Sequence, residues 1–547
     1  MFHQLLTPVA GSLPLSFVVA ALPIVTVLVM LGVLRRPAWQ ASLGGLAVGL
    51  LVAVLVWQFP VGLALDSVAA GAVFALWPVM WIVFNALLLY NIAVISGRFD
   101  AFRDWVLEHL PDDRRIVLVV IGFCFGCLLE GISGFGTPVA ITSALLILVG
   151  YPPLEALTFT LIFNTAPVAF GALGAPVTVL GQVTGLPAAQ LGAMIGRQLP
   201  FLALLLPFYV MAIYGGMRSV RALWPVLLVA GGSFAVAQFV SSNYLDYALT
   251  DVLSSLTALA ATLGFLRVWA PAPDAEFTMR AVPVAARAVG ADVVAGPAAG
   301  AGPGGIPGWQ GWVPWIVVSV VVIAWTHFKI FTIGAQALPW PGLHNEVLIT
   351  LYKDKPYAAV WTFQPLATGT AILLSAVITA GLVGVGPGRF VECIGQTWKQ
   401  SRIAIFTVAL IVGLAYLMNY SGLNYTLGLG VASVGILFPL LSPFLGWVAV
   451  FLSGSDTSGN ALFGNLQVVA ANQLGLNPVL IAATNSSGGV MGKMISPQNI
   501  ATGVSVTSLK GQEGVVFART FKHSIVLTVV LGLLVLLQQY VVPWMIP

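Results

Sequence analysis

The sequence predicts an all-α polytopic membrane protein with roughly 12–14 transmembrane or re-entrant helical elements, arranged in two repeated halves with broken helices. Three observations predict this class. Only 7% of the 547 residues are charged and 59% are hydrophobic, whereas a soluble domain carries about 25% charged residues. Apolar runs long enough to cross a bilayer recur along the chain. A short motif containing Asn, Gly and Pro occurs twice, starting at Asn164 and at Asn485.

The expected membrane elements are apolar runs separated by polar, Gly or Pro residues. Apolar runs of about 20 residues occupy positions 14–34, 43–59, 74–96, 116–128, 199–217, 224–241, 312–331, 366–385, 403–420 and 525–542. Two further stretches, 140–180 and 424–492, are apolar but interrupted. Basic residues gather at span ends, among them Arg36, Arg98 and Arg115. Under the positive-inside rule these ends are cytoplasmic, so we expect the N-terminus and segment 332–358 on the external face.

Charge and cysteine content limit the partners of the chain. The net charge of +4 comes from basic residues at span ends, so we expect a lipid bilayer around the protein and no nucleic-acid partner. Cys124 and Cys127 form a C-x-x-C inside an apolar run, without a second pair or nearby histidines. Packing explains them better than a metal or redox site, which needs more ligands. We therefore expect no metal and no cofactor.

The chain divides at a segment of different composition. Residues 270–309 are rich in Ala, Gly and Pro and lack a helical period, which predicts a flexible cytoplasmic linker. The linker separates an N-terminal membrane half, 1–269, from a C-terminal half, 310–547. The first half contains a broken-helix repeat at about 116–190 and the second contains one at about 440–505. This arrangement predicts an internal duplication.

The repeated motif points to a binding site. Asn164–Pro176 and Asn485–Pro497 both read Asn-x6-Gly-x4-Pro, and each follows a Gly/Ser segment, 130–138 or 453–460. Paired Gly/Pro-broken segments in corresponding halves mark the binding sites of secondary transporters. A helix broken inside the membrane exposes free N–H groups and the positive end of its dipole, which attract carboxylates.

Polar residues in these segments are the candidate site residues. We expect hydroxyl, amide and ammonium groups to bind a small hydroxylated carboxylate, and these candidates are Ser133, Thr137, Asn164, Thr165, Ser455, Thr457, Ser458, Asn485, Ser486 and Lys493. Glu130 and Asp456 occupy similar places in the two Gly/Ser segments. A carboxylate at bilayer depth is costly to ionise, so both are candidates for proton coupling. Lys493 either meets the substrate carboxylate or pairs structurally with Asp456.

Four segments resemble the bacterial L-lactate permease family: EGISGFGTPVAI (130–141), NTAPVAFGALG (164–174), SGSDTSGNALFG (453–464) and GGVMGKMISPQ (488–498). Segments 84–91 and 368–374 resemble it too, so the resemblance covers nearly the whole chain, although the linker at 271–307 matches nothing associated with the family. The resemblance implies import of lactate, glycolate and related 2-hydroxy monocarboxylates in symport with protons. It also implies a multi-pass protein of the bacterial inner membrane.

Three alternatives remain open from the sequence. A sodium- or proton-coupled carrier of another organic anion, such as gluconate or a di- or tricarboxylate, shares the broken-helix pattern. A channel also fits two broken-helix copies. An enzyme is less well supported, because the sequence has no G-x-S-x-G or H-E-x-x-H motif. The sequence does not fix the oligomeric state, and a homodimer is one open state.

Overall fold

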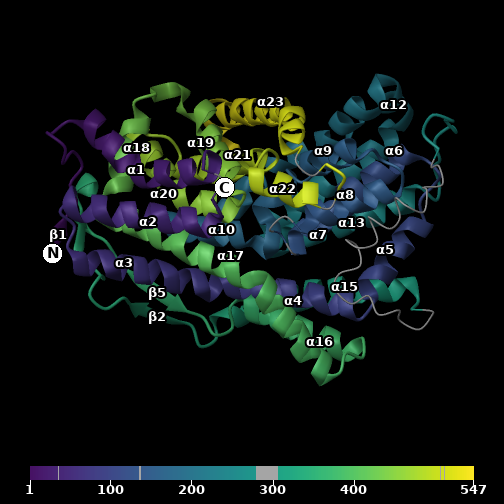
Figure 1. Cartoon of the computed structure of the whole chain (residues 1–547), viewed down its shortest axis with the longest axis horizontal. Helices are drawn as coiled ribbons and strands as arrows, with labels where there is room; N and C mark the ends of the chain where they lie inside the picture. Colours follow the sequence, from purple (N-terminus) through teal and green to yellow (C-terminus); the bar gives the residue numbers. More distant parts are fainter. Residues whose placement is uncertain (35, 133, 135–136, 279–305, 506, 510–511) are drawn as a thin grey trace.

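The fold is a bundle of helices with a small strand-bearing segment at one end (Figure 1). A computed structural model describes the chain from residue 1 to 547 except residues 35, 133, 135–136, 279–305, 506 and 510–511. Most of the predicted linker, 270–309, and the candidate residue Ser133 therefore lie outside the described residues. The two-half organisation stays a prediction.

The part of the chain before the predicted linker contains both long and short helices. Three short irregular helices used below are η2 (Leu118–Phe125), η3 (Val168–Phe170) and η5 (Tyr247–Leu249). The α-helices are α1 (Leu13–Gly32), α2 (Ala38–Leu55), α3 (Val61–Phe74), α4 (Trp81–Ile95), α5 (Arg98–Glu108), α6 (Arg114–Val117), α7 (Gly126–Ile132), α8 (Thr137–Leu148), α9 (Pro153–Phe163), α10 (Gly171–Thr184), α11 (Ala188–Ile195), α12 (Leu199–Val240) and α13 (Thr250–Phe265).

The part after the linker follows the same pattern of long apolar helices and shorter, more polar ones. Its α-helices are α15 (Val313–His327), α16 (Thr368–Leu382), α17 (Pro387–Ser421), α18 (Leu423–Ala432), α19 (Phe438–Ser453), α20 (Asp456–Leu474), α21 (Pro478–Lys493), α22 (Pro497–Ser505) and α23 (Glu513–Tyr540).

The described residues contain nine helical segments that are long and apolar enough to cross a membrane. Two further pairs of consecutive helices are long and apolar enough only when the two helices of a pair are counted as one span. These pairs cover 153–184, with a bend of 64°, and 423–451, with a bend of 105°. Two shorter apolar helices, 138–147 and 368–382, add to this set. The predicted fold class, a helical polytopic membrane protein, is confirmed.

Five short strands, which the sequence did not predict, form the strand-bearing segment. β1 (Phe2–His3) pairs in parallel with β3 (Val347–Ile349), and β3 pairs with β4 (Lys355–Pro356). β2 (Gln336–Pro339) pairs antiparallel with β5 (Val360–Phe363). The pairing of β1 with β3 holds the N-terminus beside segment 332–358, so both lie on one side of the molecule. Figure 1 places β2 and β5 far from α5, which carries two of the basic residues predicted to be cytoplasmic.

The two Gly-rich segments meet in the middle of the bundle. α19, α20 and α21 pack on one another, and α10 contacts both α20 and α21. α7 in turn contacts α10 and α13. Residues 116–132 are buried throughout, so α7 lies inside the protein rather than against lipid. This packing brings residues near position 130 together with residues near positions 456 and 493.

A buried ionic cluster fixes the first described residues of the linker to α6. The Arg115 guanidinium is 1% exposed and lies 2.7 Å from an Asp113 carboxylate oxygen and 3.5 Å from Asp274 Oδ2. The Phe277 ring covers it, with the guanidinium carbon 4.4 Å from the ring centroid.

Replacing Arg115 with Ala should destabilise the fold, because two acidic groups would lose a buried partner, and breaking a buried pair costs about 3–5 kcal/mol. The check is the thermal unfolding temperature of the purified protein in detergent. Arg221→Ala, at an exposed position, is the matched control and should change stability by less than about 0.5 kcal/mol. Equal unfolding temperatures for the two variants would contradict the structural role of the cluster.

Candidate functional site

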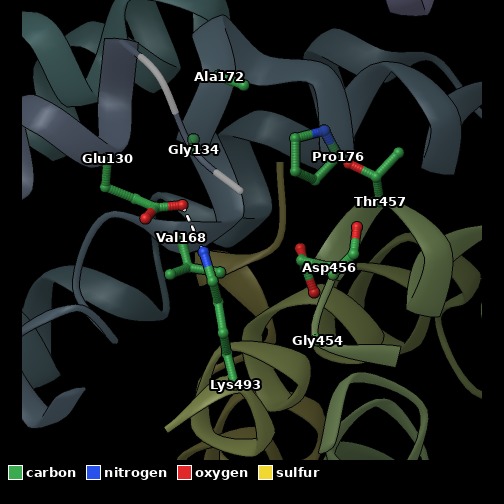
Figure 2. Close-up of a pocket in the computed structure, with 11 residues that line it drawn as sticks. Glu130, Gly134, Val168, Ala172, Pro176, Gly454, Asp456, Thr457 and Lys493 are labelled. Atoms are coloured by element: carbon green, nitrogen blue, oxygen red, sulfur yellow. Dashed lines mark hydrogen bonds and ion pairs between the residues drawn. The ribbon is translucent and has the colours of Figure 1, made fainter. Parts of the chain in front are cut away.

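A pocket lies where the two Gly-rich segments meet (Figure 2). Space not filled by atoms, including space open to solvent, amounts to only about 310 Å³. Backbone and side chains of both chain halves form its wall: Glu130, Gly134, Val168, Gly171, Ala172, Pro176, Gly454, Ser455, Asp456, Thr457 and Lys493. The small size favours a small ligand.

A buried ion pair crosses the pocket. Lys493 Nζ lies 2.5 Å from Glu130 Oε1, and the two side chains are 6% and 2% exposed. Asn164 Nδ2 donates a hydrogen bond of 3.0 Å to the other carboxylate oxygen, Oε2. Lys493 is the last residue of α21, where the negative end of the helix dipole favours a cation. Figure 2 shows Lys493 extended toward Glu130, with Asp456 on another side of the same space.

The second acidic residue, Asp456, has one satisfied and one free oxygen. Its Oδ2 accepts hydrogen bonds from Ser486 Oγ at 2.5 Å and from Asn460 Nδ2 at 3.2 Å. Its Oδ1 is buried and has no hydrogen-bond partner among the described residues. A buried carboxyl oxygen without a partner is energetically unfavourable. Asp456 also lines the pocket, so its carboxyl group lies beside the space that a ligand would occupy.

Breaks in the helices expose backbone to the pocket. Gly454, with φ 70°, ends α19, and the Ser455 side chain caps α20 by accepting a 3.4 Å hydrogen bond from the Ser458 N–H. Residues 454–457 all line the pocket, so the N-terminus of α20 opens onto it. The partial positive charge there favours an anion.

On the other wall, Ala172 and Leu173 adopt left-handed backbone conformations, with φ 46° and 54°. Such conformations are unfavourable for residues with a side chain and persist where the surroundings impose them.

Two glycines allow the carboxylates to approach the backbone. A Cβ on Gly171 would lie 2.9 Å from Glu130 Oε1, and a Cβ on Gly489 would lie 2.3 Å from Asp456 Oδ1. A side chain at either position would push the neighbouring carboxylate aside. These glycines therefore fix where the two carboxylates lie.

The predicted site residues occupy different places relative to the pocket. Glu130, Ser455, Asp456, Thr457 and Lys493 line it. Asn164 and Ser486 lie behind the wall and hold the two carboxylates. Lys493 forms its ion pair with Glu130, whereas the sequence analysis named Asp456 as its candidate structural partner.

Other predicted residues do not line the pocket. Thr165 donates to the carbonyl of Ile162, and Asn485 donates to Asn460 and to the carbonyl of Gly459. The Ser458 N–H is bound by the cap of α20. Thr137 begins α8, but its side chain, like the whole of Ser133, lies outside the described residues.

Sequence reasoning missed Asp251 and Gly489. Asp251 is fully buried at the start of α13, and an acidic residue inside an apolar run was a signal for it. It was overlooked because an acidic residue in the first turn of a helix is also an ordinary stabilising feature. Nothing in the sequence indicated that Gly489 would touch Asp456, because that contact depends on how α20 and α21 pack.

Discontinuous helices beside a binding site, inside a bundle of membrane-spanning helices, are a feature of many secondary transporters. The sequence profile of the L-lactate permease family matches residues 16–542. The chain belongs to this family. It is therefore a multi-pass protein of the bacterial inner membrane.

Individual relatives agree with this assignment. The chain is 42% identical to the glycolate permease GlcA of Escherichia coli (strain K12), with 97% of each chain covered. It is 41% identical to the L-lactate permease of Salmonella typhimurium, with 98% of each chain covered. Among solved structures, the antimetabolite efflux pump MtrF of Neisseria gonorrhoeae superimposes with a TM-score of 0.50 at 13% identity, covering 94% of this chain and 97% of the other. This last likeness concerns the fold alone.

A double-mutant cycle should detect the Lys493–Glu130 pair. Lys493→Met and Glu130→Gln should each lower the unfolding temperature in detergent, because each leaves a buried charge without its partner, at a cost of about 3–5 kcal/mol. The double variant should lose less than the sum of the two, because no unpaired charge remains. Lys399→Met, at an exposed position on α17, is the control and should have little effect. Additive losses would contradict a direct pair.

Proposed function

We propose that this protein imports L-lactate and related small 2-hydroxy monocarboxylates, such as glycolate, in symport with protons. The observation that carries the proposal is the buried Lys493–Glu130 ion pair in the pocket. An ammonium group is the natural partner of a substrate carboxylate. In this structure the Glu130 carboxylate already pairs with the Lys493 ammonium group. The substrate carboxylate and Glu130 therefore compete for Lys493.

The chemistry of the pocket supports a small monoanion. Among the described lining residues, Lys493 is the cation, while Glu130 and Asp456 are the acids. One cation balances one carboxylate, whereas a di- or tricarboxylate would leave unbalanced negative charge in a buried site. Ser455 and Thr457 supply hydroxyl groups that suit the 2-hydroxyl of the substrate. The names of two relatives, a glycolate permease and an L-lactate permease, support the same substrate class.

Charge balance explains how a proton and an anion would move together. Without substrate, Lys493 is neutralised by Glu130. When Glu130 takes up a proton, its carboxyl becomes neutral and Lys493 loses its counter-charge, which is unfavourable in a buried site. Lactate then restores neutrality. Binding either the proton or the anion alone changes the net charge of the pocket by one, whereas binding both leaves it unchanged, so the two bind as a pair.

The remaining polar groups support binding rather than coupling. Asn164 donates a hydrogen bond to Glu130, and Ser486 donates one to Asp456. Asn164 is the first residue of one repeated motif, and Ser486 directly follows Asn485, the first residue of the other. This correspondence supports the proposed duplication of the two halves. We assign Asp456, whose Oδ1 is free among the described residues, to contact with the substrate hydroxyl. We assign Glu130 to proton coupling.

Transport by the purified protein tests the proposal. In proteoliposomes with an inward proton gradient and no sodium, radiolabelled L-lactate should accumulate. Glycolate should compete, and a protonophore should abolish accumulation. Uptake should fall as external pH rises, because Glu130 must bind a proton before lactate displaces it from Lys493. Failure of lactate to enter, or entry only with sodium, would contradict the proposal and favour another organic anion or coupling ion.

Two isosteric variants separate the roles of the acids. Glu130→Gln removes the competitor for Lys493, so lactate should still exchange across the membrane but should no longer accumulate with the proton gradient. Asp456→Asn keeps a hydrogen-bonding group next to Ser486 and should retain accumulation at a reduced rate. The measurements are lactate counterflow and gradient-driven uptake in the same vesicles. Loss of coupling in Asp456→Asn with coupling intact in Glu130→Gln would reverse the assignment.

A further inference from the structure

A third acidic residue, Asp251, lies beside the pocket without lining it. Its side chain is 0% exposed, and neither carboxyl oxygen has a hydrogen-bond partner in the described part of the chain. It packs against α7, because a Cβ on Gly131, the residue after Glu130, would lie 2.6 Å from the Asp251 Cβ. Asp251 is close enough to Glu130 and Lys493 to interact electrostatically with both.

The surroundings of Asp251 favour its neutral form in this state. An isolated carboxylate in a dry interior is so unfavourable that the group takes up a proton instead. The titratable groups that interact with Asp251 are Glu130 and Cys127 on α7 and Lys493 from α21. Lys493 is the only cation among these, and Glu130 already neutralises it. We therefore take Asp251 to carry a proton in this state.

The helix that carries Asp251 begins beside residues that lead to the strand-bearing segment. Asp251 lies in the first turn of α13, directly after η5. Just before η5, Asp246 Oδ2 accepts a 2.6 Å hydrogen bond from Thr326, near the end of α15. The chain continues from there into the strand-bearing segment, which is predicted to be external. Asp251 is thus linked through η5 and α15 to the segment that is predicted to be external.

We propose that Asp251 is a second proton-binding residue, which delivers the coupling proton from the external side to Glu130. In this step an O–H bond of the Asp251 carboxyl breaks and an O–H bond forms on Glu130. Asp251 becomes the anion, Glu130 becomes neutral, and the total charge of the three groups is unchanged. Lys493 and the N–H groups at the start of α13 stabilise the transient Asp251 anion. A proton from the external solution then restores neutral Asp251. This inference rests on the proposed proton-coupled uptake.

Replacing Asp251 with Asn removes the transferable proton and keeps the shape of the side chain. Gradient-driven lactate uptake should fall by about 100-fold, the lower end of what a positioned proton donor contributes. Lactate counterflow should continue, because the pocket is intact, and lactate binding should keep its pH dependence, because the Lys493–Glu130 pair is unchanged. Retained pH dependence of binding distinguishes this variant from Glu130→Gln. Asp251→Ser is a second variant in case Asn is not tolerated.

The matched control is Asp246→Asn. Asp246 lies five residues earlier and both of its oxygens accept hydrogen bonds, from Ala248 N–H at 2.8 Å and from Thr326 at 2.6 Å. It should keep wild-type gradient-driven uptake. Wild-type uptake in Asp251→Asn, or equal losses of counterflow and uptake, would overturn the relay.

Infrared spectroscopy of the wild-type protein provides a test independent of transport. At neutral pH the spectrum should contain the carbonyl band of a protonated carboxyl group in an apolar environment. The wild-type minus Asp251→Ser difference spectrum should assign such a band to Asp251, whereas Asp456→Asn should leave that band in place. Absence of any such band in the wild-type protein would overturn the proposal without a variant. If the band is lost in the Asp251 variants but lactate is not transported by the wild-type protein, the proposed function fails and the proton on Asp251 stands.

Discussion

The structure depends on one electrostatic constraint, a lysine ammonium group held deep inside a membrane protein. Burying a single charge is far more costly than burying a pair, so Lys493 requires a partner at every stage of any cycle. In the present state Glu130 is that partner at 2.5 Å. An anionic substrate is able to replace it only if Glu130 becomes neutral at the same time. A single buried cation is thus sufficient, in our account, to link the movement of a proton to the movement of a carboxylate.

The irregular backbone around the pocket follows from the same constraint. Continuous helices would satisfy their own N–H groups and would present only side chains to a substrate. The break at Gly454 directs the N-terminus of α20 into the pocket, and the left-handed turn at 172–174 brings Gly171 against Glu130. Gly489 likewise packs against the Asp456 carboxyl group. Strain and lost helical hydrogen bonds are tolerated because they place dipoles and carboxylates around one small space.

The sequence predicted the class of the fold and most of the charged site. Composition and apolar runs were enough for a helical membrane bundle, because lipid leaves so few alternatives for backbone hydrogen bonding. Glu130, Asp456 and Lys493 were predicted because ionisable residues are conspicuous in an apolar chain. Pairing was not predictable, since Lys493 and Glu130 are 363 residues apart and their contact depends on how α7 and α21 pack. The strands at 336–363 were missed because short loop strands carry little hydrophobic pattern.

The most direct test of the account is to count protons as lactate binds. Isothermal titration calorimetry of the purified protein, repeated in buffers that differ in ionisation enthalpy, measures the protons taken up or released per lactate bound. The account predicts that one proton is taken up for each lactate at a pH where Glu130 is ionised in the free protein. It also predicts that this uptake disappears in Glu130→Gln while binding remains. Lactate binding without any proton uptake in the wild-type protein would contradict competition between the substrate and Glu130 for Lys493.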